Sequence, residues 1–253
     1  VPGFPSKRED KNWIIPEIFL RKKQPPQSLQ SPCGHRRGDR DRPQPAALCI
    51  WLIVRNVSLL IDTDAFCVLA SGRLLDDAVS LFGADLSRCA RLPALPHMLR
   101  KGRLRKKYGD QISGHLIPIA DSIPVIDQAE ALWIDRLTQV QNIDPGEAQL
   151  FALAAEKQLV VITGDKRALR ALRDVPGFAN ALAGRIVVLE AILIALCTRL
   201  GPTAVSAQMQ PLLTHDSVIR VCFSSGNPDP RDALLSYYQN LVTELDPLVL
   251  WQP

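Results

Sequence analysis

The sequence has no closely spaced cysteine pair, no histidine cluster and few aromatic residues. Its six cysteines are scattered without a CxxC pair, and its four histidines lack the spacing of a metal site. Zinc-finger and disulfide-framework proteins are therefore excluded, because both need such spacings. A chain of 253 residues that is 47% hydrophobic can instead fold around its own core. We expect reduced, buried thiols in a cytoplasmic protein.

No apolar run in the sequence is long enough to cross a membrane. The run at 48–61 is interrupted by Arg55 and Asn56, and the run at 189–200 is too short for a bilayer. The apolar stretch near the N-terminus contains Pro16 and Glu17, which the core of a secretory signal would not. We therefore expect no membrane partner.

The first 53 residues have little that could form a core. Residues 1–45 contain ten Lys and Arg against five Asp and Glu, a net charge of +5, whereas residues 46–253 have a net charge of −1. A basic, proline-rich segment cannot bury enough apolar surface to offset the entropy lost on ordering it. We predict that residues 1–53 are disordered. One hypothesis places the natural start of the protein near Val54 or Val57.

Strands alternate with helices from Ser58 onward. Unbroken apolar runs at 59–61, 159–163 and 185–189 predict buried strands. This alternation indicates an α/β fold with three layers, α/β/α, and a mainly parallel central sheet. Residues 54–190 would form this domain, and residues 191–253 a helical extension packed on the domain or on a partner. The predicted helices include 65–82, 85–91, 123–140 and 166–173.

Three carboxylates stand where a predicted strand or loop passes into a helix. Asp62 follows the first strand, Asp165 follows Thr163 after one glycine, and Glu147 opens an apolar helix. The carboxyl ends of parallel strands line the ligand crevice of an open α/β sheet, so we expect these side chains to gather there. Carboxylate oxygens suit Mg²⁺ or Mn²⁺, and such cations promote phosphodiester cleavage.

Each acid could instead have a structural role, which must be weighed against metal binding. Asp144 and Glu147 are spaced as a capping box, and Asp165 can cap the helix that follows it. We expect Asp64 to cap the helix after the first strand, which leaves Asp62 without a structural role. Neighbouring carboxylates raise each other's pKa unless a cation or hydrogen-bond donors offset them. This favours a functional interpretation of Asp62.

Two basic segments are candidates for holding the phosphates of a nucleic acid. Cationic side chains bind phosphate oxygens through charge neutralisation. Both segments are equally well explained as solvated helix surface, and no aromatic platform for stacking bases accompanies them. The candidate residues are Lys166, Arg167, Arg100, Lys101 and Arg103.

Three short strings occur in order along the chain: LLIDTD at 59–64, DPGEAQLFALAA at 144–155 and VVITGDKRAL at 160–169. Together they resemble the PIN-domain family of metal-dependent nucleases, and the resemblance covers roughly residues 57–190. In that family one acid ends the first strand, another opens a helix, and a further one follows a later strand in a T-x-D pattern.

The resemblance implies a role for each matching residue. Asp62, Glu147 and Asp165 would be the metal ligands and catalytic acids, Thr163 the hydroxyl beside them, and Asp64 the polar residue of the first motif. It also implies a ribonuclease that depends on Mg²⁺ or Mn²⁺, with RNA as its substrate. An antitoxin would be its protein partner. Independently of the resemblance, the apolar stripe of the C-terminal extension suggests packing against the core or against a second copy of the chain.

One departure from the family pattern leaves alternatives open. The family usually supplies a further glutamate between the first and second acids, but this sequence has none from Ile18 to Ala129. Either Asp64 or another aspartate completes the site, or metal binding is weak. A catalytically degraded binding or regulatory module is therefore a second hypothesis.

Asp62-Thr63-Asp64 also matches the D-x-D that ends the first strand of haloacid-dehalogenase-type phosphatases, in which the first aspartate is a nucleophile. That family also needs a downstream lysine and an acidic pair behind a strand. The strand predicted at 185–189 is followed by Glu190 and then by apolar residues. The nuclease hypothesis is therefore the better supported.

Overall fold

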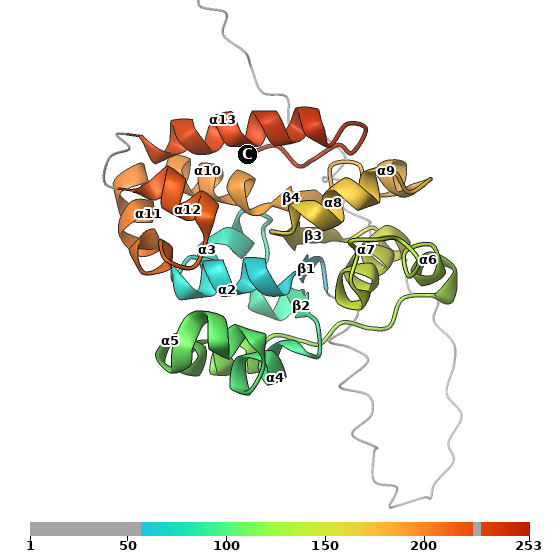
Figure 1. The fold of residues 1–253 in the computed structure, drawn as a ribbon, viewed down its shortest axis with the longest axis horizontal. Coiled ribbons are helices and arrows are strands. Elements are labelled where there is room, and N and C mark those ends of the chain that lie inside the picture. Colours follow the sequence, from blue (N-terminus) through green and yellow to red (C-terminus); the bar gives the residue numbers. More distant parts are fainter. Residues whose placement is uncertain (1–56, 225–228) are drawn as a thin grey trace, which may run out of the picture. The chain divides into compact units, whose positions relative to one another are not determined.

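A computed structural model describes residues 57–224 and 229–253, so the disorder predicted for residues 1–53 lies outside the described residues. The centre of the fold is a four-stranded parallel sheet in the order β2-β1-β3-β4 (Figure 1). The predicted α/β fold with a parallel sheet is confirmed. The strands are β1 (Leu59–Ile61), β2 (Cys89–Arg91), β3 (Val160–Thr163) and β4 (Ile186–Val188).

Helices cover both faces of the sheet. The chain leaves β1 in one direction along the sheet, towards β2, and leaves β3 in the opposite direction, towards β4. Right-handed crossovers therefore place the helices of these two connections on opposite faces. One face carries α2, α3 and α10, and the other carries α7, α8 and α9 (Figure 1). Their bounds are α2 (Thr63–Ser71), α3 (Leu75–Ser80), α7 (Pro145–Lys157), α8 (Lys166–Arg173), α9 (Phe178–Ala181) and α10 (Leu189–Leu200).

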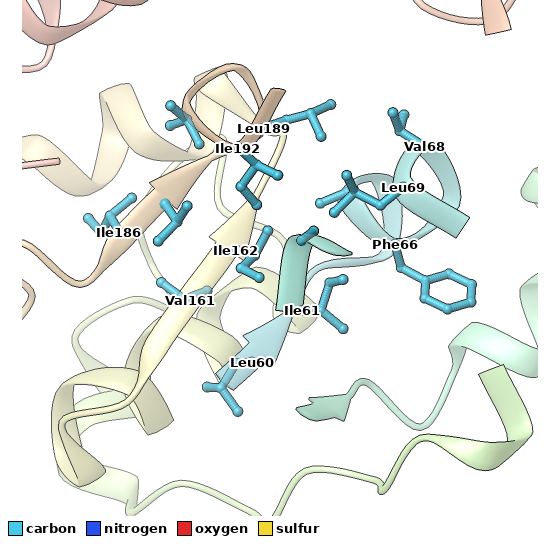
Figure 2. Packing of buried hydrophobic residues seen from close by; sticks show 14 of the residues in the cluster. Leu60, Ile61, Phe66, Val68, Leu69, Val161, Ile162, Ile186, Leu189 and Ile192 are labelled. Atoms are coloured by element: carbon cyan, nitrogen blue, oxygen red, sulfur yellow. The ribbon is translucent and has the colours of Figure 1, made fainter. Parts of the chain in front are cut away.

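The core lies between the sheet and these helices. All three residues of β1 and of β4 are buried, as strands covered on both faces require. Figure 2 shows side chains of β1, β3 and β4 together with those of α2 and α10. The labelled members of this cluster are Leu60, Ile61, Phe66, Val68, Leu69, Val161, Ile162, Ile186, Leu189 and Ile192.

The remaining helices surround this centre. The helices α4 and α5 pack on each other, α5 also contacts α2, and α6 packs on α7. In the C-terminal helical extension, α13 lies along α10 (Figure 1). The chain then returns to the sheet, where the backbone N–H of Trp251 donates to the carbonyl of Ile186. The bounds are α4 (Leu95–Arg100), α5 (Arg103–Ser122), α6 (Ala131–Asp135), α11 (Pro202–Met209), α12 (Ser217–Phe223) and α13 (Pro230–Glu244), with short 3-10 helices η2 (Leu86–Arg88) and η3 (Gln210–Leu212).

Three predicted helices are wrong. The helix expected at 65–82 is divided into α2 and α3, because the chain turns at Gly72 and at Arg73, which has a positive φ of 54°. The helix expected at 85–91 is instead η2 followed by β2, a strand held by its pairing with β1. The helix expected at 123–140 is extended at its start, because Pro124 disfavours a helical residue before it, and forms only α6.

Helix length and cysteine burial can be read from the described residues. Within 57–224 and 229–253, each helix is too short or too polar to span a bilayer. Burial of the thiols is confirmed for Cys67, Cys89, Cys197 and Cys222.

Candidate active site at the carboxyl edge of the sheet

The strand order reverses direction between β1 and β3, and the carboxyl ends of these two strands lie side by side. These neighbouring strands send their connections to opposite sides, which is the arrangement where open α/β sheets bind ligands. Asp62 immediately follows β1, and Asp165 follows β3 after Gly164. Two of the three predicted acids therefore stand on either side of the point where the topology reverses.

Asp62 is held by contacts from β3 and from the first residue of α2. Its backbone N–H donates to the carbonyl of Ile162 on β3 over 2.9 Å, which continues the sheet pairing beyond β1. One carboxylate oxygen, Oδ1, accepts from the backbone N–H of Thr63 at 2.6 Å. The other, Oδ2, accepts from Thr163 Oγ1 at 3.4 Å. The side chain is thus fixed at the carboxyl edge of the sheet and is only 7% exposed.

The environment of Asp62 favours its protonated form. Burial, followed by the charge of Asp64, raises the pKa of the Asp62 carboxyl to about 7, with further contributions from Asp165 and Asp144. The hydrogen bond from the Thr63 amide acts in the opposite direction but is weaker. Burial is thus the main cause of the raised pKa, and repulsion from the neighbouring carboxylates adds to it.

The predicted roles of Asp62 and Asp64 in capping are reversed. Asp62 is the N-cap of α2, whereas Asp64 lies in the first turn of that helix. Asp64 is half-exposed, and its Oδ1 pairs with Lys107 Nζ at 3.4 Å. The helix begins two residues earlier than predicted, because the chain turns into it directly at the end of β1. Asp62 therefore does have a structural role, and its burial beside other acids is what distinguishes it.

Glu147 forms the predicted capping box at the start of α7. Its backbone N–H donates to Asp144 Oδ1 at 2.9 Å, and its Oε2 accepts from the backbone N–H of Asp144 at 2.7 Å. Burial raises the pKa of the Glu147 carboxyl to about 8, helped by the charges of Asp144 and Asp165 and opposed by the Asp144 amide. Glu147 also shares a side-chain hydrogen bond with Asp165, which favours a protonated Glu147.

Asp165 caps α8, as predicted. Its Oδ1 accepts from the backbone N–H groups of Arg167 at 2.8 Å and Ala168 at 3.1 Å, and its Oδ2 accepts from Arg167 Nη2 at 3.0 Å. Burial works towards a higher pKa, but the hydrogen bonds from Arg167 and Ala168 outweigh it and hold the pKa of Asp165 below its ordinary value. Asp165 is thus the carboxylate that stays ionised among these acids.

Thr163 links the acids to one another. It is buried at the end of β3, and its Oγ1 donates to Asp62 Oδ2 and accepts from the backbone N–H of Asp165 at 3.1 Å. Asp165 in turn shares a hydrogen bond with Glu147. A continuous chain of contacts therefore joins Asp62, Thr163, Asp165 and Glu147, which come from the starts of three different helices and from one strand.

The predicted basic residues are placed differently from one another. Arg167 is largely exposed beside Asp165, whereas Lys166 is turned inward to Glu190. Arg100 pairs with Asp121 of α5 at 2.5 Å. Lys101 and Arg103 are exposed around the junction of α4 and α5. Among the cationic side chains at 100–107, Lys107 pairs with Asp64, an acid of the candidate site.

Two cavities lie beside the helices that carry Asp165 and Glu147, although these acids do not line them. One, of about 490 Å³, is lined by Arg167, Arg170 and Arg173 of α8 and by the loop 140–142. The other, of about 430 Å³, is lined by the first turn of α7, including Gly146, and by the segments that follow β2 and α5. One cavity thus lies beside the Asp165 helix and the other beside the Glu147 helix.

Glu190 is a polar residue at this edge that the sequence analysis did not assign to the site. It is in the first turn of α10, directly after β4, and it is 1% exposed. Its position after a predicted strand was the same signal that identified Asp62. Glu190 lies outside the three motifs and is followed by apolar residues, so the sequence pattern did not point to it.

The chemistry of the donor set fits a hard divalent cation, but the side chains are not arranged around one point. Three carboxylates and one hydroxyl are the oxygen ligands that Mg²⁺ and Mn²⁺ prefer. Among residues 57–224 and 229–253, however, no three His, Cys, Asp or Glu side chains form a group that could hold a metal ion. Each carboxylate instead has an oxygen engaged by the backbone at the start of its own helix.

Comparison of the chain with protein-family models gives no match, and comparisons with curated proteins and with solved structures give no match either. The resemblance to the PIN-domain family therefore rests on the three sequence motifs and stays a prediction.

Proposed function

We propose that residues 57–190 form a PIN-like, metal-dependent phosphodiesterase that acts on RNA. The observation that carries this proposal is the chain of contacts from Asp62 through Thr163 and Asp165 to Glu147 at the carboxyl edge. Helix capping alone would not require these side chains to contact one another. Buried carboxylates that repel one another are costly unless a cation offsets them.

Asp62, Asp165 and Glu147 would hold the Mg²⁺ or Mn²⁺ ion, with Asp64 as a fourth candidate. Such an ion lowers the pKa of a bound water and stabilises charge on a phosphate. The protein's own contribution is positional: Thr163 orients Asp62 and Asp165 relative to each other. Asp62 and Glu147 must both be ionised to act as ligands, and their raised pKa values make this step depend on pH.

The substrate is proposed to lie along α8. Arg167 stands at the rim of the site, next to the cavity that Arg170 and Arg173 also line. Arginine binds phosphate oxygens through a planar array of donors, which suits a nucleic-acid backbone. The choice of RNA and of an antitoxin as a partner rests on the family resemblance. The cytoplasmic location rests on the expectation of reduced thiols, and a second copy of the chain as a partner rests on the apolar stripe of the C-terminal extension.

The second candidate is a binding module of the same fold that has lost catalysis. Two observations favour it: the described residues contain no group of ligands arranged for a metal, and Arg167 occupies Asp165 Oδ2. In this case RNA binding would persist without cleavage, because the arginines do not depend on a metal ion.

The proposal is tested by Mn²⁺ titration in a calorimeter and by cleavage of single-stranded RNA, each with the wild type and with Asp62→Asn. We expect the variant to keep its fold and to lose cleavage by about 10³-fold, because several kcal/mol of transition-state stabilisation would be lost. The matched control is Asp110→Asn, an exposed aspartate paired with Arg105. Unchanged cleavage by Asp62→Asn would remove Asp62 from the mechanism, and RNA binding without Mn²⁺ binding would favour the binding module.

A further inference from the structure

A buried ion pair joins α8 to α10 beside the acids, and the proposed function does not account for it. Lys166 Nζ lies 2.6 Å from Glu190 Oε1, and the two side chains are 16% and 1% exposed. The other carboxylate oxygen, Glu190 Oε2, is buried and has no hydrogen-bond partner in the described part of the chain.

Stability is a poor explanation for this pair. Removing two charges from water is expensive, and the attraction between them repays the cost only where the remaining donors and acceptors are also satisfied. Glu190 Oε2 is not satisfied. The pair between Arg170 and Glu244 offers a contrast, because it also ties α8 to a neighbouring helix but is exposed and has two hydrogen bonds. An exposed ion pair would be sufficient if α8 only had to be attached to a neighbouring helix.

The strand register places the buried pair at the candidate site. Thr163 on β3 pairs with Val188 on β4, so Asp165 and Glu190 each stand two residues beyond paired positions. Lys166 is the first residue of α8, immediately after Asp165. The ion pair therefore fixes the first turn of α8 against the start of α10, and this turn holds the amides that bind the Asp165 carboxylate.

We propose that Glu190 is a positioning residue that acts through Lys166 to orient the carboxylate of Asp165. The ion pair sets where the N–H groups of Arg167 and Ala168 point, and these groups set the direction of Asp165 Oδ1. The consequence for metal binding rests on the proposed function. The consequence for the geometry of the first turn of α8 does not.

The test removes both charges at once, in the variant Lys166→Met/Glu190→Leu. Removing one partner alone would leave an uncompensated buried charge and destabilise the protein, whereas replacing both by apolar groups is commonly neutral. The matched control is Arg199→Met/Asp77→Leu, which removes an exposed pair between α10 and α3. The measurements are the melting temperature, the affinity for Mn²⁺ by calorimetry and the hydrogen-exchange rates of the Arg167 and Ala168 amides.

We expect the buried-pair variant to melt close to the wild type but to bind Mn²⁺ 10- to 100-fold more weakly, the usual range for residues that orient a metal ligand. The Arg167 and Ala168 amides should exchange at least about tenfold faster, because local opening of the first turn becomes easier. The control variant should leave both measurements unchanged.

Wild-type values of both the exchange rates and the Mn²⁺ affinity in the buried-pair variant would overturn the inference and leave the pair as a structural link. If the wild type itself binds no Mn²⁺, the proposed function fails. The exchange rates then decide the positioning role alone: faster exchange supports it and unchanged exchange overturns it. Should the apolar replacement not fold, Lys166→Met/Glu190→Gln removes the same charges while keeping a polar group at 190, and the same outcomes apply.

Discussion

Asp62 and Asp165 occupy matching places in two neighbouring units of the fold. Each follows a central strand, each caps the helix that begins there, and Thr163 Oγ1 contacts both residues. Yet the pKa of Asp62 is raised to about 7, whereas that of Asp165 is lowered. The same local motif therefore holds one carboxyl that tends to keep its proton and one that tends to lose it.

The difference comes from the number of donors and from the charged neighbours. Asp165 receives two backbone N–H groups and the guanidinium of Arg167. Asp62 is more deeply buried, has one short backbone contact and lies beside Asp64. A helix cap thus does not by itself decide the charge state of the capping residue, since burial and the surrounding charges outweigh it.

The largest expected effect is the contribution of Asp62 to the pH dependence of the free energy of unfolding. The folded state keeps the Asp62 proton up to about pH 7, whereas the unfolded chain releases it near its ordinary value of 3.8. The free energy of unfolding of the wild type should therefore fall as pH rises through this window, by up to about 4 kcal/mol. Asp62→Asn should remove this part of the decline. Urea unfolding at intervals from pH 4 to 8.5 measures it, and parallel curves for the two proteins would contradict the assignment.

Asp165→Ala should show the opposite dependence and a smaller effect. Loss of the cap should lower the free energy of unfolding by about 1–2 kcal/mol at pH 7. Because the folded-state pKa of Asp165 is depressed, its contribution is present above the ordinary value of 3.8 and is lost as pH falls below it. Urea titrations extended below pH 3.8 should therefore show the variant and the wild type converging in acid. A difference that grows as pH falls would show that Asp165 is not the ionised partner.

Thr163→Val should disturb both aspartates together. Valine has nearly the same shape but leaves the backbone N–H of Asp165 without the oxygen that accepts from it, which should cost about 1 kcal/mol. Thr163→Ser keeps the hydroxyl and is the matched control. Chemical denaturation gives the stability change, and Mn²⁺ titration shows whether the link between the two acids also matters for metal binding. Equal stability of the valine and serine variants would deny the hydroxyl this bridging role.

The smallest effect is expected for Asp64→Asn. Its pair with Lys107 spans 3.4 Å and is exposed to solvent, so screening should keep the stability change below about 0.5 kcal/mol. The charge of Asp64 nevertheless raises the pKa of Asp62, so the variant should lower that pKa. NMR titration of the Asp62 carboxyl carbon measures the shift. An unchanged Asp62 pKa would remove Asp64 from the causes of its elevation.

Local patterns in the sequence were sufficient for some elements and not for others. The runs at 59–61 and 159–163 predict β1 and β3, because an unbroken apolar run bounded by polar residues is typical of a strand buried on both faces. Neither β2 nor the extended segment at Pro124 has such a pattern. Cys89–Arg91 becomes a strand because β1 offers it a partner, and its buried Arg91 is accommodated by the carbonyl of Ala120. The preferences of single residues cannot predict this pairing, because β1 is distant in the sequence.

The sequence by itself determined that the chain would form an α/β fold and that acids would follow its strands. Hydrophobic periodicity and strand-ending carboxylates are local properties, which depend only on residues near one another in the chain. Only the tertiary structure decided that Asp62 rather than Asp64 caps α2, that Lys166 turns inward to Glu190, and that Asp62 and Asp165 titrate in opposite directions. The physical reason is that burial and electrostatic interaction depend on distances in space between residues far apart in the sequence, such as Asp62 and Thr163.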